Sequence, residues 1–328
     1  MQNISQNKLP AYKEIFSFAN LFSAWQEFKK RKSKKQDVAE FASDLVHNLS
    51  LLENDSLSFN YKHGGYVHFK ISDPKPRDIH KASVRDRVVH HAICRALYPY
   101  FNSKFTHDSY SCRVNKGTYK AINRFRQMFR KVSKNNTRTC WVLKCDIKKF
   151  FANIDHQILK EILAREIYDR DVLWLLEQVI NSFDPGLPLG NLTSQLLVNV
   201  YMNEFDQFAK RELKVKYYIR YADDFIILHK DKEYLENLLP QINTYLNTYL
   251  NIYLHPGKVF IKTLASGVDF LGWVHFPKHQ VLRTSTKRRM LVRLNNSSSE
   301  STISSYQGLL KHGNTFKILK SNHQAGCR

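Results

Sequence analysis

The sequence Tyr-Ala-Asp-Asp at residues 221–224 constrains the fold of this chain more than any other feature. It joins two apolar runs, residues 217–219 and 225–228, so we expect a β-hairpin with Asp223 and Asp224 at its tip. Two adjacent carboxylates repel each other and contribute nothing to a core. Bound divalent cations would explain why two acids lie side by side at a turn. The chemistry that such a metal site most often supports is phosphoryl transfer. Taken alone, the pair is also compatible with a solvated turn.

A site for two cations needs a carboxylate from another element, and Asp146 is the candidate. It follows the apolar segment 141–143, so we expect it at the end of a strand that lies beside Asp223. Oxygen ligands with open positions suit Mg²⁺, and we expect two such ions, for which Mn²⁺ can substitute. Ile147, the next residue, is included among the candidate metal and nucleotide contacts.

The order of these blocks resembles that of the reverse transcriptases, over about residues 75–276. A strand ending in Asp146 is followed by an aromatic residue, a glycine-containing turn into a helix, and then residues 221–224. The resemblance implies an α+β right-hand polymerase fold with fingers, a palm whose antiparallel sheet is backed by helices, and a short helical thumb. The domain ranges that we expect are a basic helical N-terminal extension at 1–50, fingers at 51–140, palm at 141–276 with fingers elements around 160–190, and thumb at 277–328.

The resemblance also implies roles for residues near the carboxylates. Asp146, Asp223 and Asp224 correspond to the catalytic metal ligands, although Asp224 could instead orient the other ligands. Phe151 corresponds to a steric gate against the 2′-hydroxyl, which implies a DNA product, whereas Phe150 is expected to turn into the core.

Several basic residues are candidates for contact with the triphosphate. Arg77 and Arg113 lie in blocks that resemble fingers motifs, where guanidinium groups could clamp phosphates. Arg85 and Arg87 fit a helix and could simply pair with Asp86 or phosphate. Lys258 resembles the family's candidate proton donor to departing pyrophosphate, and a plain surface lysine is the alternative.

The sequence GLPLGNLTSQ at residues 186–195 indicates which group of reverse transcriptases the chain resembles. Most reverse transcriptases carry Gln-Gly where this chain has Leu189 and Gly190. This departure, followed by Ser194 and Gln195, resembles the reverse transcriptases of diversity-generating retroelements. Leu189 would then lie against the nascent base pair, where loss of an amide relaxes discrimination, and simple packing is the alternative. Gly190 and Gln195 join the candidate nucleotide contacts.

This resemblance implies mutagenic retrohoming, in which a template-repeat RNA is copied into cDNA with errors at template adenines to diversify a variable gene. Its implied companion is a small, basic, oligomeric accessory variability protein. The rival interpretations are a reverse transcriptase of a retron, a group II intron or a phage-defence system, a catalytically idle RNA-binding protein on a polymerase scaffold, and a DNA-templated polymerase.

The charge of the chain indicates a polyanionic partner. The sequence has 51 Lys and Arg against 29 Asp and Glu, a formal net charge of +22, so template RNA, RNA–cDNA hybrid and dNTPs are the expected ligands. No apolar stretch reaches the length of a spanning helix and no signal-peptide pattern begins the chain, so we expect no membrane association and a cytoplasmic location. Five cysteines without a Cys-x-x-Cys pair predict neither a disulfide framework nor a structural zinc site.

The remaining segments give expectations about local structure. Residues 1–50 are expected to be helical, with Leu21, Phe22, Trp25 and Phe28 on one face, followed by the basic run 29–35, which could hold RNA or be a solvated loop.

Further along the chain, residues 57–73 predict a hairpin around 63–65. Thr193 or Ser194 should cap the helix after Gly190. Tyr245, Tyr249 and Tyr253 should form one packed stripe of a helix. A Ser/Asn hinge at 295–299 should separate two pieces of the thumb.

Overall fold

An antiparallel four-stranded sheet forms the centre of the protein in the computed structural model, which describes residues 9–72, 76–296 and 299–314. The strands, in their order across the sheet, are β4 (Tyr218–Tyr221), β5 (Asp224–His229), β3 (Trp141–Asp146) and β6 (Phe260–Thr263). The hairpin predicted at residues 221–224 is confirmed, because Tyr221 pairs with Asp224 and the two residues between them form the turn. In the neighbouring ladder, Asp146 lies opposite Asp224, as expected for a strand that ends beside the hairpin tip.

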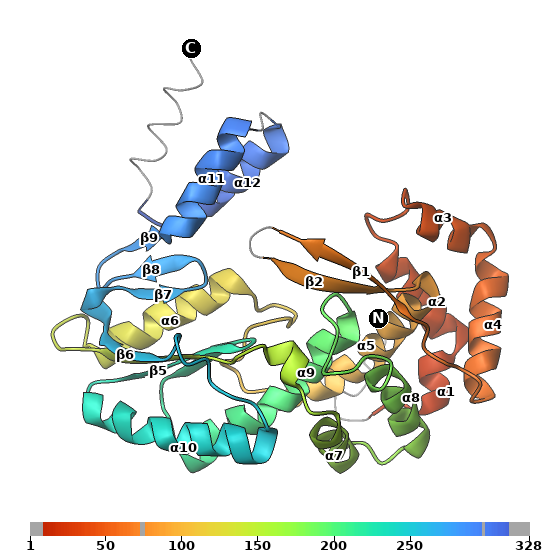
Figure 1. Ribbon diagram of the computed structural model, residues 1–328, viewed down its shortest axis with the longest axis horizontal. Coiled ribbons are helices and arrows are strands. Elements are labelled where there is room, and N and C mark those ends of the chain that lie inside the picture. Colours follow the sequence, from red (N-terminus) through yellow and green to blue (C-terminus); the bar gives the residue numbers. More distant parts are fainter. Residues whose placement is uncertain (1–8, 73–75, 297–298, 315–328) are drawn as a thin grey trace.

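The two faces of this sheet are covered by different helices (Figure 1). They are α6 (Thr118–Val132) on one face, and α9 (Leu192–Gln207) and α10 (Lys232–Leu250) on the other. Alternate residues of each strand divide between the faces, so Val142 and Ile226 pack in the α6 core while Leu143 and Phe225 pack in the other. Phe205 of α9 lies 4.8 Å from the Phe225 ring, which confirms that this helix packs beneath the sheet.

The N-terminal residues form helices, as predicted for the described part of 1–50. The N-terminal helices and the helices grouped with them are α1 (Tyr12–Phe16), α2 (Phe18–Phe28), α3 (Gln36–Ser43), α4 (Leu45–Leu57), α5 (Val84–Lys104), α7 (His156–Glu166) and α8 (Arg170–Ile180). Leu21, Trp25 and Phe28 are buried, but Phe22 is 40% exposed, so the prediction was wrong for that ring. The expected boundary at 50/51 lies inside α4.

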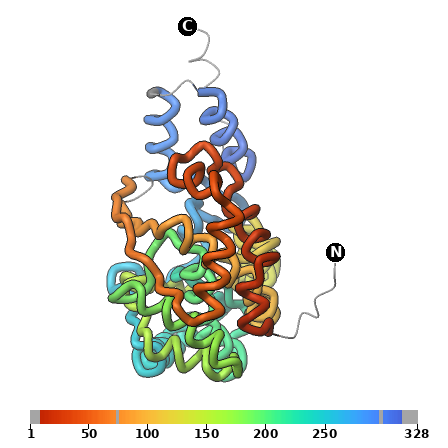
Figure 2. The backbone as a smooth tube through the Cα atoms, turned by 90° about the vertical axis from the view of Figure 1, so that its right-hand side faces the viewer, coloured from red at the N-terminus to blue at the C-terminus, as the bar shows by residue number. Residues whose placement is uncertain are grey.

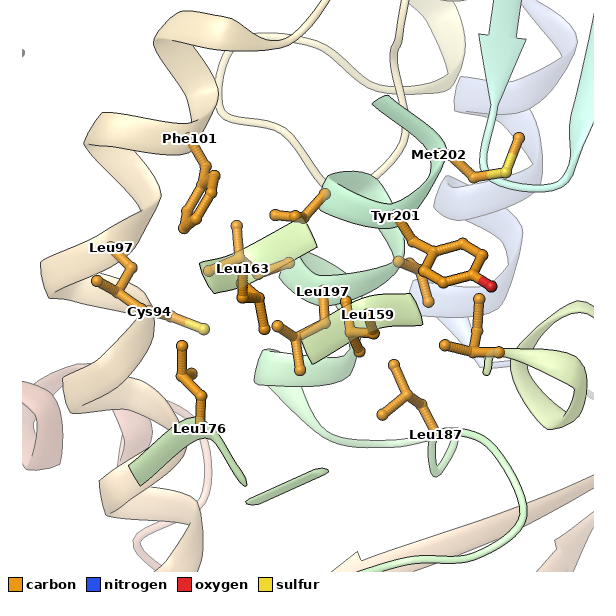
Figure 3. Close-up of a cluster of buried hydrophobic side chains, with 14 of the residues drawn as sticks. Cys94, Leu97, Phe101, Leu159, Leu163, Leu176, Leu187, Leu197, Tyr201 and Met202 are labelled. Carbon is orange, nitrogen blue, oxygen red and sulfur yellow. The ribbon is translucent and has the colours of Figure 1, made fainter. Parts of the chain in front are cut away.

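One hydrophobic core joins these helices to the sheet. In Figure 3, Leu97 of α5, Leu163 of α7, Leu176 of α8 and Tyr201 of α9 point into a single cluster. That cluster continues to Trp25 in α2, so the N-terminal helices and the sheet share their packing rather than forming separate cores.

The hairpin predicted at 57–73 lies elsewhere. Its strands are β1 (Tyr66–Ile71) and β2 (Arg77–Ala82), and Tyr66 pairs with Ala82. Residues 63–65 are a connection rather than a turn, because Gly64 N–H donates to the buried Asp86 carboxylate at 3.1 Å. This contact with α5 fixes the glycine in place before the hairpin begins.

Two other local predictions need correction. Helix α9 begins after Asn191 instead of Thr193 or Ser194, since the Thr193 hydroxyl bonds to His90 Nδ1 at 2.8 Å. Of the tyrosine stripe only Tyr245 packs as expected, stacked on Phe208 at 3.9 Å. Tyr249 and Tyr253 are 63% and 49% exposed, because the first faces solvent and the second lies beyond the end of α10.

The C-terminal part combines a small sheet with a helix pair. Its elements are β7 (Val268–Phe270), β8 (Trp273–His275), β9 (Gln280–Leu282), α11 (Thr284–Asn296) and α12 (Glu300–Leu310). Trp273, Met290 and Leu310 form a separate core that attaches the helices to the sheet, and Figure 2 shows the pair projecting at one end of the molecule. The expected boundary at 276/277 lies between the paired strands β8 and β9.

Of the Ser/Asn hinge predicted at 295–299, Asn295 and Asn296 belong to the end of α11, and Ser299 precedes α12. Residues 297–298 lie outside the described residues, as does the rest of the expected thumb after residue 314. Short helical turns complete the fold: η1 (Phe150–Asn153), η2 (Phe208–Glu212) and η3 (Leu264–Ser266). Within the described ranges, no helix is long and apolar enough to cross a membrane.

Candidate active site

The hairpin turn and the end of β3 bring the predicted carboxylates together. Asp223 lies in the turn, after Ala222 in the left-handed region with φ of 57°. The Ile147 N–H donates to the Asp223 carbonyl at 3.3 Å, which ties the end of β3 to this turn. Asp146 and Asp224 are cross-strand partners, so their side chains project from the same face of the sheet. The sequence prediction that Asp146 lies beside the hairpin tip is therefore confirmed.

Lysines neutralise two of the three carboxylates. Lys258 Nζ lies 2.8 Å from Asp146 Oδ1, which brings this predicted residue to the site. Lys144 Nζ lies 3.0 Å from Asp224 Oδ2 and donates to the Asp269 carbonyl at 2.8 Å. Sequence reasoning missed Lys144, although a lysine inside an apolar strand, two residues before Asp146, was an available signal.

The electrostatics of the carboxylates suit a bound cation. Burial and then the nearby Asp146 charge raise the pKa of Asp223. Burial raises the pKa of Asp224 to about 6 against the opposing charge of Lys144, and Asp224 Oδ1 has no hydrogen-bond partner. Ionising a buried carboxylate costs free energy, and a bound divalent cation would offset that cost.

The three carboxylates are not arranged as three ligands around one point. In the part of the chain that the structure describes, no three His, Cys, Asp or Glu side chains form a metal-binding group. Asp224 pairs with Lys144, whose side chain is 10% exposed, whereas the Lys258 side chain that pairs with Asp146 is 46% exposed. The more buried pair fits the alternative that Asp224 orients the site. Asp146 and Asp223 are the pair whose donor chemistry fits a metal.

A buried ion pair supports the turn that carries Asp223. This pair was not predicted from the sequence. Arg220 and Asp206 are both fully buried, and two guanidinium nitrogens donate to the two carboxylate oxygens at 2.8 and 2.7 Å. Arg220 Nη1 also donates to the Ala222 carbonyl at 3.0 Å. Since Ala222 has a positive φ that costs a non-glycine residue energy, this bond helps to hold the turn that carries Asp223.

The loop at 186–190 lies between η1 and β2. Leu187 N–H donates to the Phe151 carbonyl at 2.8 Å, and His80 N–H donates to the Leu189 carbonyl at 3.0 Å. Phe150 is buried, so its predicted turn into the core is confirmed, and Phe151 is half-buried beside it. Leu189 and Phe151, two predicted nucleotide contacts, are thus connected through one hydrogen-bonded segment.

Gly186 makes this connection possible, and replacing it with alanine should disrupt it. The residue has φ of +73°, and a Cβ would overlap the Phe151 carbonyl oxygen and lie 2.7 Å from Ala152 Cα. We expect Gly186→Ala to lower the free energy of unfolding by about 1–3 kcal/mol or more, because both backbone strain and overlap oppose the loop position. Urea denaturation measures this loss. Gly65→Ala is the matched control, since its Cβ would meet nothing within 4 Å, and equal stability of the two variants would contradict the loop account.

The predicted arginine clamp is only half supported. Arg77 on β2 is exposed, and its positive charge lowers the pKa of Asp223 slightly, against burial and the Asp146 charge, which raise it. Arg113 was a wrong prediction, because its guanidinium donates to Asn102 and to the carbonyls of Thr106 and Ser109 at 2.7–3.2 Å. These bonds fix a loop and leave little of the side chain for a phosphate.

The other predicted contacts fall in two places. Ile147 is buried directly beside the carboxylates, with its backbone paired to Leu254. Gly190 and Gln195 line a cavity at the start of α9, together with side chains of α2 and α5. The α5 arginines pair with acids, Arg85 with Asp55 at 3.0 Å and Arg87 with Asp37 at 2.7 Å.

Comparison with known proteins identifies the family. The sequence profile of the family "Reverse transcriptase (RNA-dependent DNA polymerase)" matches residues 70–275, more than half of the chain and the whole of the carboxylate site. This chain belongs to the reverse transcriptase family. The family generally uses divalent metal ions, in agreement with the donor chemistry of Asp146 and Asp223.

Two curated relatives and one solved structure are similar to this reverse transcriptase. Protein YkfC of Escherichia coli (strain K12) is 26% identical over 287 residues, 74% of this chain and 73% of YkfC. Group II intron-encoded protein LtrA of Lactococcus lactis subsp. cremoris is 25% identical over 158 residues, 45% of this chain and 25% of LtrA. Apo telomerase from Candida tropicalis has a TM-score of 0.53 at 12% identity, covering 66% of this chain and 48% of the telomerase chain. The structural likeness confirms the right-hand polymerase fold.

Proposed function

We propose that this reverse transcriptase copies an RNA template into DNA at the site formed by Asp146 and Asp223. The observation that carries the proposal is the β3–β5 register, which places Asp146 beside the hairpin turn that presents Asp223. Two Mg²⁺ ions, or Mn²⁺ in their place, bound there would lower the pKa of the primer 3′-hydroxyl and stabilise the departing pyrophosphate. Asp146 and Asp223 would hold the metals, the Ile147 backbone lies beside these two residues, and Asp224 would orient the site from its pair with Lys144.

Neighbouring side chains are assigned to the incoming nucleotide. Arg77, an exposed cation at the start of β2, binds the triphosphate as a charged donor. Phe151 excludes a 2′-hydroxyl, so the enzyme selects dNTPs. Lys258 leaves Asp146 when substrate binds and donates a proton to pyrophosphate, for which its 46% exposure gives it freedom to move.

We further infer that the enzyme belongs to a diversity-generating retroelement. Leu189 stands where most reverse transcriptases carry a glutamine, and it is half-buried on the loop tied to Phe151. An apolar side chain against the templating base offers no hydrogen bond that depends on correct base pairing. Discrimination against incorrect dNTPs opposite adenine is therefore weaker. The template would be a template-repeat RNA whose adenines are miscopied.

Restoring an amide at this position should raise fidelity. We expect Leu189→Gln to reduce errors opposite template adenine by about tenfold, the value of one hydrogen bond of about 1.4 kcal/mol. Sequencing of cDNA copied from an RNA containing all four bases gives the error spectrum. Leu189→Met is the control, because it keeps an apolar side chain of similar size and should keep the wild-type spectrum. An unchanged error spectrum in Leu189→Gln would contradict the proposal that Leu189 causes errors at template adenine. It would not affect the proposal that the protein copies RNA into DNA.

The nearest rival is a reverse transcriptase of another mobile element, and relatives that include group II intron-encoded proteins favour it. Under either proposal we assign β1–β2 and α5 to the fingers, the four-stranded sheet to the palm and α11–α12 to the thumb. A small basic accessory variability protein is the proposed partner and the cytoplasm the proposed location.

A further inference from the structure

Lys144 is a buried cation on β3, a central strand of the sheet. Its neighbours along the strand, Leu143 and Cys145, are fully buried, and Lys144 itself is only 8% exposed. A buried ammonium group costs free energy unless it is paired and hydrogen-bonded. The groups that Lys144 contacts therefore indicate what the residue does in this position.

The two acceptors of Lys144 belong to different parts of the fold. Lys144 Nζ lies 3.0 Å from Asp224 Oδ2, at the carboxylate site. The same nitrogen donates to the Asp269 carbonyl at 2.8 Å, in strand β7 of the C-terminal sheet β7–β9. One side chain thus contacts both a carboxylate of the candidate active site and the backbone of a neighbouring sheet.

Asp269 continues this connection to the C-terminal helices. Its carboxylate forms an ion pair with the Arg283 guanidinium, and the Arg283 N–H donates to the Gly272 carbonyl at 3.0 Å. The Arg283 carbonyl accepts a hydrogen bond from the Lys287 N–H at 2.9 Å, in the first turn of α11. Arg283 is therefore the residue at which the chain passes from β9 into α11, and Asp269 holds its side chain.

The C-terminal sheet lies between the central sheet and the helix pair α11–α12 (Figure 1). Val268 and Phe270 of β7 pack in one core with Val142 of β3, and Trp273 of β8 packs in another core with Met290 of α11. Apolar packing is non-directional, whereas hydrogen bonds have a preferred direction. The polar connection through Lys144 therefore fixes the position of the helix pair more closely than packing alone would.

We propose that Lys144 is a positioning residue that, through Asp269 and Arg283, fixes the helix pair α11–α12 relative to the Asp224 carboxylate. The inference rests on the proposed polymerase function, in which this helix pair is the thumb that holds the primer–template duplex. The duplex carries the primer 3′-hydroxyl, so a shift of about 1 Å between the helix pair and the carboxylates would cost about 10²-fold in rate. Because Lys144 is buried, its effect appears in the rate of synthesis and not in binding of the duplex.

A matched pair of lysine variants tests the positioning role in the full chain. Lys144→Met keeps an unbranched side chain and removes the charge with both contacts. We expect kcat for primer extension to fall at least about tenfold, while the KM for dNTP and the Kd for the primer–template duplex stay within about twofold of wild type. Lys262→Met is the control, because Lys262 of β6 pairs with Val142 and projects from the same sheet face as Lys144. It leaves the bond between Lys144 and Asp269 in place and should change none of these quantities beyond about twofold.

Arg283→Met tests the second half of the connection at a residue whose side chain is 31% exposed. We expect kcat at saturating duplex to fall about threefold. Because Lys144 and Arg283 act through the same residue, the double variant Lys144→Met/Arg283→Met should have a kcat within about twofold of that of Lys144→Met alone. Two independent roles would instead multiply the losses, to about thirtyfold.

Hydrogen exchange follows the same connection without catalysis. Lys144→Met removes an anchor of the C-terminal sheet, so amides of β7 and of the first turn of α11 should exchange at least about threefold faster than in the wild-type protein. Lys262→Met should leave the exchange of these amides unchanged.

Each other outcome overturns the proposal. Equal kcat values for Lys144→Met and Lys262→Met, or losses that multiply in the double variant, contradict a positioning role. A raised KM or Kd with unchanged kcat assigns Lys144 to substrate binding instead. If Lys144→Met does not fold, an unchanged kcat in Arg283→Met overturns the proposal by itself. Absence of DNA product from the wild-type protein contradicts the polymerase proposal separately, and unchanged hydrogen exchange in Lys144→Met then still contradicts the connection.

Discussion

Replacing Asp223 with asparagine should reduce DNA synthesis by about 10³-fold or more, because a carboxylate that holds the catalytic metals is worth several kcal/mol in the transition state. The amide keeps the size of the side chain and removes its charge. Since burial and Asp146 already raise the pKa of Asp223, losing this charge should not destabilise the fold. Single-turnover primer extension measures the rate, and thermal denaturation measures the fold.

Asp44→Asn is the matched control for this variant. Asp44 is exposed at the start of α4 and its side chain makes no capping hydrogen bond. It should retain wild-type activity. An Asp223→Asn protein that is folded and retains more than about a tenth of the wild-type rate would exclude Asp223 as a metal ligand, since losing such a ligand costs several kcal/mol.

Replacing Arg220 with methionine should lower the free energy of unfolding by about 3–5 kcal/mol, because it leaves the buried Asp206 carboxylate without its partner. Five hydrogen bonds are lost together: two to Asp206, one to the Ala222 carbonyl, and one each to Ser109 and Asn199. Urea denaturation at one pH gives the change in stability. This is the largest stability effect that we expect from a single substitution in the protein.

A combined variant separates the stability of this pair from its effect on the turn. Tyr218 also donates to Asp206, at 2.5 Å, so Arg220→Met, Asp206→Leu and Tyr218→Phe together remove the buried charges and the hydroxyl bonded to them. Apart from the bond to the Ala222 carbonyl, only the weaker bonds from Arg220 to Ser109 and Asn199 are left unreplaced. We expect this variant to recover most of the lost stability. DNA synthesis should stay at least about tenfold below wild type, because the turn that carries Asp223 has lost its bond to Arg220. Full activity in the combined variant contradicts a positioning role for Arg220.

The central sheet and its carboxylates could be predicted because their signals are local. Residues 217–228 show two apolar runs around a turn, and residues 141–146 show an apolar strand that ends in Asp146. Period-two alternation then assigned Phe150 to the core, and its burial agrees. Long, strongly patterned segments of this kind leave few alternatives for the chain.

Features that depend on distant partners could not be predicted. Arg113 was expected to bind phosphate, but its donors are taken by carbonyls that the end of α5 and the loop after it present only once folded. Arg220 looked like a strand residue, and its role depends on Asp206, 14 residues earlier on another element. For the same reason the hairpin was predicted at residues 57–73 but lies at residues 66–82. The contact between Gly64 and Asp86 cannot be seen in the sequence.

Primer extension by the wild-type protein on a defined RNA template, with Mg²⁺ and dNTPs, tests whether the protein copies RNA into DNA. The template contains all four bases, and the same reaction with a DNA template or without divalent metal runs beside it. We predict DNA complementary to the RNA, dependent on the metal, with errors concentrated opposite adenine. A folded protein that binds the RNA and makes no complementary DNA would exclude RNA-templated DNA synthesis and favour an RNA-binding protein on a polymerase scaffold.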